Sequence, residues 1–498
     1  TDHEISIRLR ATQQNPSVLP ADSLYAIEHD TMDTTFRSMY QGLYIYLSAR
    51  KERRDLLLSQ RPPRFDESLD SMISRSEDDF TRIALKAKAA QDYFLLIGPP
   101  GTGKTSCALK KMVETFHADK DAQILLLSYT NRAVDEICKS LASIAPAVDF
   151  IRVGSELSCD EAYRGHLIEN ELSSCNRRSE VYERIRNCRI IVGTVAAISG
   201  KPELFRLKHF DVAIIDEATQ ILEPQLLGIL CARGEDGKDA IDKFVLIGDH
   251  KQLPAVVQQN TEQSAIYDES LLSIGLTNLK DSLFERLYRN CTATVHRSYD
   301  MLCRQGRMHP EVALFANRAF YGGRLIPVGL PHQIESSDTI CRLAFYPSVP
   351  EKAGASAKIN YSEARIVADL AARIYEDHQT DFDESRTLGI ITPYRSQIAL
   401  IKKEIESLGI PALNRILVDT VERFQGSERD VIIYSFCVNY PYQLKFLSNL
   451  TEEEGVLIDR KLNVALTRAR KQMFITGVPE LLERNPLYKS LLKLIESF

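Results

Sequence analysis

Apolar segments alternate with amphipathic segments along most of the chain and predict two α/β units in tandem. In the first unit, strands are expected at residues 93–97, 124–128, 150–153, 189–192, 212–215 and 244–247. In the second unit, which begins after about Cys291, strands are expected at residues 342–346, 387–392, 415–419, 430–436 and 472–476. Helices are expected at residues 106–117, 362–375 and 395–408. Because several strands are continuous apolar runs, the pattern favours parallel sheets covered on both faces.

The first 90 residues and one internal segment differ from this alternation. Apolar residues from Phe36 to Leu47 recur at helical spacing and predict a helix that packs on a core. Basic residues 50–54 continue this helix, either as its solvated end or as a contact with nucleic acid. A polar helical segment at residues 158–187 has the pattern of an insertion in the first unit. The expected domains are residues 1–90, 91–290 and 291–498.

A glycine-rich segment after the first expected strand carries the strongest chemical signal. It reads Gly98-Pro-Pro-Gly-Thr-Gly-Lys104-Thr105, a phosphate-binding loop in strand–loop–helix context. Glycines let backbone N–H groups surround phosphate oxygens, and the helix N-terminus adds partial positive charge. Lys104 would reach the β- and γ-phosphates of ATP, and the Thr105 hydroxyl would bind Mg²⁺. The expected nucleotide-binding residues are Gly98, Pro100, Gly101, Thr102, Gly103, Lys104, Thr105 and Ser106. The alternative is a Gly/Pro turn before a core helix.

Two further strand ends carry residues that suit phosphoryl transfer. Asp216 and Glu217 end an apolar strand, where Asp216 would hold Mg²⁺ and Glu217 would orient or deprotonate the attacking water. Gln252 follows the next strand and could contact the γ-phosphate. The carboxyl ends of parallel strands share one sheet edge, so these residues are expected beside the phosphate loop. A helix cap and a plain turn are the respective alternatives.

These segments resemble the ordered motifs of superfamily 1 helicases, in the group that contains the nonsense-mediated-decay RNA helicase and the DNA-replication nuclease-helicase. Further motifs follow at residues 128–135, 193–195, 305–310, 392–395, 418–428 and 463–470, and the resemblance covers residues 91–477. It implies two RecA-like domains with ATP between them and movement along a single strand, typically 5′ to 3′. DNA is favoured over RNA because the lead-in at residues 92–95 is closest to that of the nuclease-helicase.

The resemblance also implies roles for individual residues. Arg307 and Arg468 from the second domain would approach the γ-phosphate, and Glu428 would contact the ribose. The nucleic-acid track would be lined by Asn131, Arg132, Thr194, Tyr394, Arg395 and Thr420. Each track residue has the alternative of a surface loop or a helix cap.

Two positions depart from the family pattern. Phe80 stands where the family has a glutamine that reads adenine, and Gly306 stands where it has a tyrosine that stacks on the base. Both changes remove adenine contacts and leave the phosphate contacts. The sequence therefore predicts weaker discrimination between ATP and other nucleoside triphosphates.

Composition limits the remaining possibilities. The net charge of −6 means that a nucleic-acid site must be a local groove, and no run approaches the roughly 18 apolar residues of a membrane span. Ten scattered cysteines predict reduced thiols in a cytoplasmic compartment, or in the nucleoid or nucleus. The chain opens with Thr1, and we expect a fragment whose residues 1–20 end an accessory barrel. An N-terminal nuclease part would lie outside this chain.

Two other functions stay open from the sequence. The same fold could act on RNA, or the chain could be a nucleotide-switched module that remodels protein complexes without unwinding. The paired Arg307 and Arg468 favour hydrolysis over a passive switch.

Overall fold

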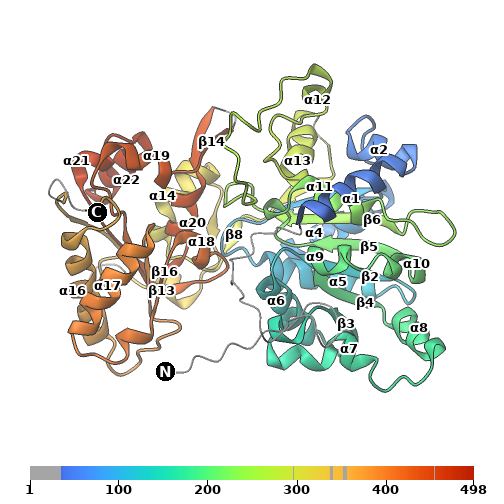
Figure 1. The fold of residues 1–498 in the computed structure, drawn as a ribbon, viewed down its shortest axis with the longest axis horizontal. Helices are drawn as coiled ribbons and strands as arrows, with labels where there is room; N and C mark the ends of the chain where they lie inside the picture. The colour runs from blue at the N-terminus through green and yellow to red at the C-terminus, as the bar shows by residue number, and fades with distance from the viewer. Residues whose placement is uncertain (1–34, 295, 337–339, 352–355, 454, 498) are drawn as a thin grey trace, which may run out of the picture.

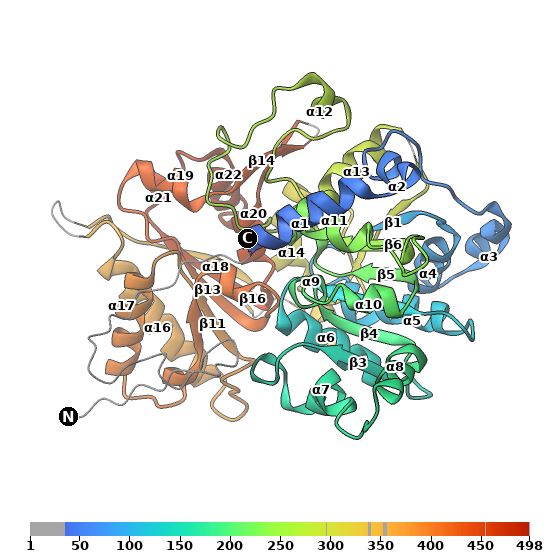
Figure 2. The same cartoon turned by 45° about the vertical axis from the view of Figure 1, so that its right-hand side comes forward.

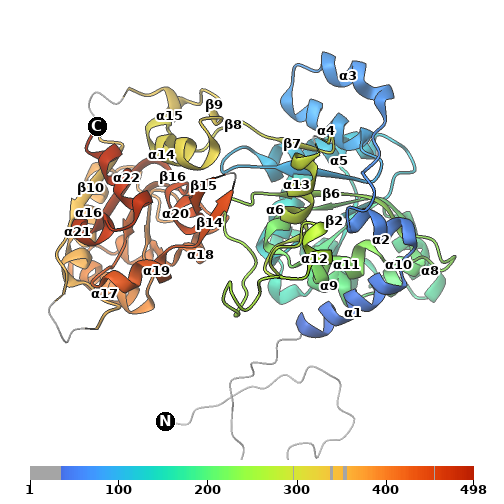
Figure 3. The ribbon, with the colours of Figure 1, turned by 90° about the horizontal axis from the view of Figure 1, so that it is seen from above.

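The computed structural model describes residues 35–497 except 295, 337–339, 352–355 and 454 (Figure 1). The barrel end expected at residues 1–20 lies outside this range. Two lobes, each built around its own parallel sheet, lie side by side (Figures 1 and 3). The expectation of two RecA-like α/β units is confirmed.

The first lobe surrounds a seven-stranded parallel sheet. Its strands, in spatial order, are β3 (Phe150–Val153), β4 (Ile190–Thr194), β2 (Ile124–Ser128), β5 (Phe210–Ile215), β6 (Ile241–Gly248), β1 (Tyr93–Ile97) and β7 (Tyr299–Met301). One face packs on α4 (Asp79–Ala89), α5 (Lys110–His117) and α6 (Asn131–Ala142). The other packs on α9 (Val195–Ser199), α10 (Glu203–Leu207), α11 (Glu223–Leu230) and α13 (Leu283–Ala293). Apolar side chains therefore fill both faces, as the continuous strands predict.

The second lobe surrounds a five-stranded parallel sheet. Its spatial order is β10 (Leu343–Pro347), β16 (Ala469–Gly477), β13 (Arg429–Ser435), β11 (Leu388–Ile391) and β12 (Leu417–Asp419). Helices α16 (Tyr361–Asp377) and α17 (Arg395–Ser407) cover one face. Helices α14 (Pro310–Tyr321), α20 (Arg460–Leu466) and α22 (Pro486–Ile495) cover the other.

Short elements connect these layers. In the first lobe they are α2 (Lys51–Leu57), α3 (Asp70–Arg75), α7 (Ile168–Glu171), α8 (Arg178–Asn187) and α12 (Glu269–Ser273). In the second they are β8 (Arg304–Gln305), β9 (Ile326–Pro327), α15 (Pro331–Ile334), α18 (Val421–Phe424), α19 (Leu444–Leu447), the hairpin β14 (Leu450–Glu453) and β15 (Val456–Asp459), and α21 (Pro479–Leu482).

Three local features differ from the sequence pattern. The helix expected at 106–117 begins earlier, as a π-helical turn at Lys104–Leu109 that continues into α5. The segment 158–187 contains the crossover between the neighbouring strands β3 and β4. Strand β7 pairs with β1, so the first sheet extends past the boundary expected at residue 290.

The N-terminal helix corrects two expectations. The single helix expected through residue 54 is two helices, α1 (Thr35–Ser48) and α2, separated at Ala49 and Arg50. The apolar side chains expected to pack on a core instead face solvent: Phe36, Tyr40, Leu43, Tyr44 and Leu47 are exposed. Helical spacing identifies an apolar face but does not decide which face is buried.

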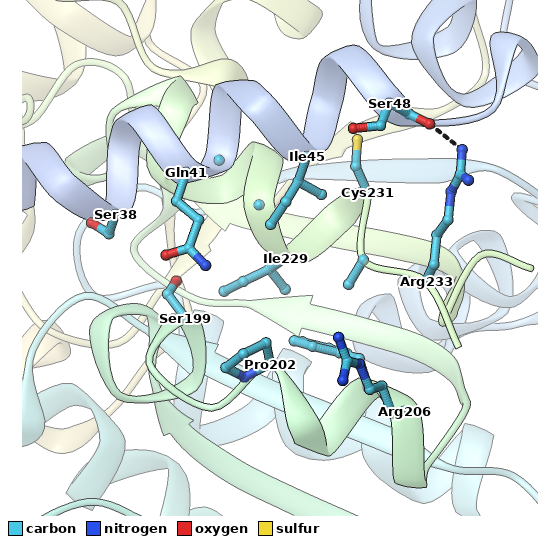
Figure 4. Close-up of a pocket in the computed structure, with 14 residues that line it drawn as sticks. Ser38, Gln41, Ile45, Ser48, Ser199, Pro202, Arg206, Ile229, Cys231 and Arg233 are labelled. Carbon is cyan, nitrogen blue, oxygen red and sulfur yellow. Dashed lines mark hydrogen bonds between the residues drawn. The ribbon is translucent and has the colours of Figure 1, made fainter. Parts of the chain in front are cut away.

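The buried side of α1 explains this orientation. Gly42 meets α11 so closely that a Cβ there would lie 2.2 Å from the backbone oxygen of Pro224. Only glycine permits this approach of two helix backbones. Figure 2 shows α1 lying along α11, and Figure 4 shows Ser38 and Gln41 beside a pocket of about 250 Å³ beneath it. Gly42 therefore sets the close approach of the two helices, and Ile45 and Tyr46 pack on the apolar core of the first lobe.

One arginine of the basic stretch after α1 has a structural role. Arg53 is buried, and its Nη2 donates hydrogen bonds to Ile241 O at 2.5 Å and Asp242 O at 3.0 Å. This arginine therefore holds α2 against the start of β6.

Candidate nucleotide site and nucleic-acid interface

The phosphate loop leaves the end of β1 in a conformation that needs its glycines. Gly101 and Gly103 have positive φ angles of 73° and 74°, which other residues adopt at a cost. At Gly98, a Cβ would lie 2.7 Å from the Cβ of Lys104. The Thr102 hydroxyl donates to Pro99 O at 2.7 Å and closes the turn. The backbone is thus wrapped around the start of the Lys104 helix.

Two acids at the end of β5 meet the loop. Lys104 Nζ lies 2.9 Å from Glu217 Oε1, and Thr105 Oγ1 donates to Asp216 Oδ2. Burial and the neighbouring Glu217 raise the pKa of Asp216 to about 6. Burial opposes the charge on Lys104, but Glu217, Asp216 and Asp249 together raise its pKa. The site therefore holds more negative charge than one lysine can balance.

This pair of oxygen groups fits a magnesium ion. The Thr105 hydroxyl and the Asp216 carboxylate are hard oxygen ligands of the type that Mg²⁺ binds. A nearby cation would also reverse the rise in the Asp216 pKa, which comes from burial and a like charge. Glu217 holds a left-handed φ of 53° and accepts a hydrogen bond from Gln220 Nε2 at 2.8 Å. Its carboxylate is thereby fixed beside Lys104.

Both arginines expected from the second lobe reach this region. The Gly306 amide donates to Gly101 O at 2.8 Å, so the loop that carries Arg307 lies directly on the phosphate loop. Arg307 Nε donates to Glu428 Oε2 at 2.6 Å. Arg468 is buried, and its Nη2 donates to Gln252 Oε1 at 3.2 Å. Burial and the nearby Arg307 lower the pKa of Arg468 to about 9.

The segment Asp249 to Gln252 bonds to the second lobe at every residue. Asp249 accepts from Tyr321 Oη at 2.7 Å, and His250 Nε2 lies 3.0 Å from Glu453 Oε2. Lys251 O accepts from Asn463 Nδ2 at 2.7 Å, and Gln252 accepts from Arg468. Asn463 also donates to Tyr321 Oη at 2.8 Å. The residue expected to contact the γ-phosphate therefore belongs to a continuous contact between the lobes.

Sequence reasoning assigned no role to three members of this network. Asp249 and Asn463 lie within motifs that the sequence identifies, and this position in a motif is the sequence signal that could have indicated a role for them. Tyr321 ends α14 like any core aromatic, and nothing in the sequence distinguishes it. The structure also brings Glu428 to Arg307 and, at 3.7 Å, to Arg470. Glu428 thus lies beside one arginine of the site.

The side of the site expected to face the base is apolar. The Phe80 ring lies beside Gly103, where a Cβ would meet Phe80 Cζ at 3.5 Å. A Cβ at Gly306 would meet Leu330 Cδ1 at 3.3 Å and Val328 Cγ2 at 3.4 Å. Aromatic and aliphatic carbon atoms therefore stand around the two departures from the family pattern.

The track residues lie at strand ends in both lobes. Thr194 ends β4, and its hydroxyl accepts from Ala197 N at 3.1 Å, so it caps α9. Asn131 begins α6 and Arg395 begins α17. Tyr394 and Thr420 stand just before α17 and α18. These positions share the carboxyl edges of the two parallel sheets.

A groove lies between the lobes next to these edges. Arg132 Nη2 donates across the lobes to Gly426 O at 3.3 Å. Nearby, a cavity of about 1210 Å³ is lined by Tyr129 and Thr130 of the first lobe and by Gln425 of the second. Its second-lobe wall also carries Lys445, Arg460, Lys461 and Arg484. The same walls carry the acids Asp281, Glu285, Glu422, Glu452 and Glu453, so the groove is mixed in charge: Arg460 pairs with Glu285, and Lys461 pairs with Glu422 at 3.1 Å.

Comparisons with known proteins extend this picture. The chain matches a family described as "AAA domain" over residues 279–480, and a second family of the same description over residues 75–181 and 168–260. It is 29% identical over 530 residues to the DNA replication ATP-dependent helicase/nuclease JHS1 of Arabidopsis thaliana, with 99% of this chain and 36% of that protein covered. It is 28% identical to the DNA replication ATP-dependent helicase/nuclease DNA2 of Homo sapiens, with 96% and 46% covered.

Two further similarities are more distant. The DNA polymerase alpha-associated DNA helicase A of Saccharomyces cerevisiae is 24% identical, with 92% of this chain and 73% of that protein covered. A solved arterivirus nonstructural protein 10 helicase in complex with DNA is 15% identical, with a TM-score of 0.40, 82% of this chain and 65% of that chain covered. The chain spans less than half the length of the helicase/nucleases that it matches. By its ordered motifs, its two RecA-like lobes and the two AAA-domain matches, the chain is a superfamily 1 helicase, and it is similar to the DNA replication helicase/nucleases.

Proposed function

We propose that this chain is an ATP-dependent DNA helicase motor that hydrolyses ATP between its lobes and moves along a single strand. The observation that carries this proposal is the contact between Arg468 and Gln252 at the phosphate loop. A buried arginine of one lobe reaches the residue of the other lobe that would face the γ-phosphate. Hydrolysis then depends on how the lobes meet.

Each residue of the site has a chemical task in this proposal. The loop amides and Lys104 hold the β- and γ-phosphates, and Glu217 orients the attacking water and accepts its proton. Thr105 and Asp216 would hold magnesium, which supplies positive charge to the phosphates when bound. Arg307 and Arg468 stabilise negative charge that develops on the γ-phosphate.

The strand would run along the groove between the sheet edges. Asn131, Arg132, Thr194, Tyr394, Arg395 and Thr420 would hold backbone phosphates without reading sequence. DNA is the proposed strand because the names of the helicase/nuclease relatives specify DNA replication. The proposed direction, 5′ to 3′, rests on the family resemblance. RNA as the strand, or a nucleotide switch without unwinding, is the alternative outcome of the test below.

The nucleotide base would meet little that can distinguish it. Phe80 offers a ring face to any base, and Gly306 offers no ring at all. Hydrogen bonds to a base give strong selectivity, whereas apolar contacts discriminate weakly. The site is therefore proposed to accept several nucleoside triphosphates.

The cellular compartment and an additional nuclease part are proposed from the cysteines and from the length of the relatives. All ten cysteines are free thiols, which suits the cytoplasm, the nucleoid or the nucleus. No helix in the described part of the chain is long and apolar enough to span a membrane. A nuclease part elsewhere in the same protein is proposed because both helicase/nuclease relatives are more than twice as long as the matched region.

ATP hydrolysis measured without a strand, with single-stranded DNA and with single-stranded RNA tests the proposal. Lys104→Ala serves as the blank, because loss of its contact to the phosphates abolishes turnover. Stimulation by DNA alone is expected. Stimulation by RNA alone would assign the chain to RNA. Lys104-dependent hydrolysis that no strand stimulates would favour the nucleotide switch.

A further inference from the structure

Three aromatic side chains, two of them exposed and Tyr440 half-buried, cluster on the second lobe between β13 and the β14–β15 hairpin. The rings of Tyr440 and Tyr442 stack with centroids 5.7 Å apart and planes at 15°. Phe446 meets Tyr442 edge to face at 6.5 Å. Tyr442 is 54% exposed and Phe446 is 70% exposed. We name these three residues the aromatic platform.

The exposed rings of the platform are not needed to fill the hydrophobic core of the second lobe. Helix α19 already buries Leu444 and Leu447, which lie three residues apart on its inner face. Lys445 and Phe446 lie between them and face outward. Large apolar side chains left in water next to a filled core indicate a binding surface when they cluster.

Hydrogen bonds hold the platform in one shape. Gln443 is buried, and its Oε1 accepts from the amides of Asn439 and Tyr440, both at 2.9 Å. Its Nε2 donates to Ala357 O at 2.7 Å and to Tyr394 Oη at 3.1 Å. The turn that carries Tyr442 is therefore fixed to Tyr394, a residue of the proposed track. Such preorganisation lowers the entropy cost of binding.

Charge and position indicate what would bind there. Lys445, which lies next to Phe446 in the chain, lines the groove between the lobes. The groove also contains Arg484, and Lys461, which pairs with Glu422 at 3.1 Å. Aromatic rings beside basic side chains, at the margin of a groove, suit a polymer with flat bases and a charged backbone. A peptide ligand would need matched carboxylates and has no such continuity with the track.

We propose that the aromatic platform stacks bases of the single strand at the margin of the groove. This proposal rests on the proposed function, because it adds a base contact to a track that otherwise holds phosphates. Stacking does not depend on base identity, since every base has a π face. The platform would therefore strengthen binding without imposing sequence specificity.

Binding of two labelled oligomers of equal length separates base contacts from backbone contacts. One is oligo-dT, and the other is an abasic deoxyribose-phosphate chain. For the double variant Tyr442→Ala/Phe446→Ala, fluorescence anisotropy should show about tenfold or greater loss of dT affinity, because each stacked base contributes roughly that factor. Affinity for the abasic chain should stay at the wild-type value. Tyr442→Phe keeps the ring and should bind dT as the wild type does.

The controls distinguish this proposal from the proposed function. Tyr44→Ala removes a ring that is 74% exposed on α1 and should leave dT affinity unchanged. Thermal melting reports folding, which should be unaffected because Tyr442 and Phe446 are exposed. Equal loss for both oligomers, equal loss in Tyr44→Ala, or wild-type dT affinity in the double variant would overturn the platform alone. A wild-type chain that binds neither oligomer would overturn the proposed function itself.

Discussion

Replacing Arg468 with alanine tests whether the two lobes share one hydrolytic site. The guanidinium is buried and donates to Gln252, Val464 O and Thr467 Oγ1. If Arg468 stabilises charge on the γ-phosphate in the transition state, its loss should lower kcat far more than ATP affinity.

The structure sets the expected size of this effect. A cationic finger contributes roughly 10³–10⁵ in rate in related enzymes. Arg307 stays beside the phosphate loop in the variant, so the site keeps one of its two arginines. We therefore expect a loss of about 10²–10³ in kcat, or about 3–4 kcal/mol, the cost of removing one preorganised donor.

Stability should change less than activity. Burial lowers the pKa of Arg468 to about 9, which means that the folded protein disfavours its charge. Removing that charge relieves this cost while it breaks the hydrogen bonds. Arg468→Ala should therefore fold, and its melting temperature checks this directly.

Two measurements decide the outcome. Steady-state hydrolysis at saturating ATP and strand gives kcat, and titration with a fluorescent ATP analogue gives affinity. Arg386→Ala is the matched control, because Arg386 is 65% exposed in the same lobe and pairs with Asp430 at 3.6 Å. A wild-type kcat in Arg468→Ala, or a loss confined to affinity, would refute the assignment.

Further predictions concern the base, the core and α1. With Phe80 and Gly306 in place, kcat/KM for ATP and GTP should agree within roughly tenfold, and a hundredfold preference for ATP would contradict the open base site. Burial raises the pKa of Glu363 to about 7 from 4.5, so the folded state keeps a proton that the unfolded state releases between these values. Stability should therefore fall by up to about 3 kcal/mol as pH rises through this window, and melting curves of Glu363→Gln should be flatter there. Gly42→Ala places a methyl group 2.2 Å from a backbone oxygen of α11 and should cost about 1–3 kcal/mol in urea unfolding. Gly165→Ala, where a Cβ meets nothing within 4 Å, should be near neutral.

The parallel sheets follow closely from the sequence because their strands are apolar on both faces. Strands β1, β2 and β3 have the expected bounds, and the other expected strands differ from the observed ones by a few residues at their ends. Because both faces of such a strand are buried, its orientation does not have to be predicted, and its position along the chain is enough to place it in the sheet. The phosphate loop is similarly local, since its glycines, lysine and threonine are contiguous.

Helix α1 shows where this reasoning fails. Its regular apolar stripe faces solvent, whereas Gly42, Ile45 and Tyr46 on the other side make the contact with the first lobe. Close approach of two backbones outweighs apolar side chains here, and only the partner helix reveals it. Tyr321 is a similar case, because its hydroxyl matters only once Asp249 of the other lobe is placed beside it.

The segment 249–252 contacts the second lobe, and the free energy of these contacts indicates how strongly hydrolysis can be coupled to motion of the lobes. Hydrogen bonds from Tyr321, Asn463 and Arg468 cross between the lobes within this one segment. Each contributes roughly 0.5–1.5 kcal/mol net, so together they amount to a few kcal/mol. A ligand can shift such an equilibrium by its difference in affinity for the two arrangements, and couplings of about 1–3 kcal/mol are typical. If Gln252 contacts the γ-phosphate, as proposed, loss of that phosphate would be sufficient to change how the lobes meet, and a strand held along both sheet edges would move with them.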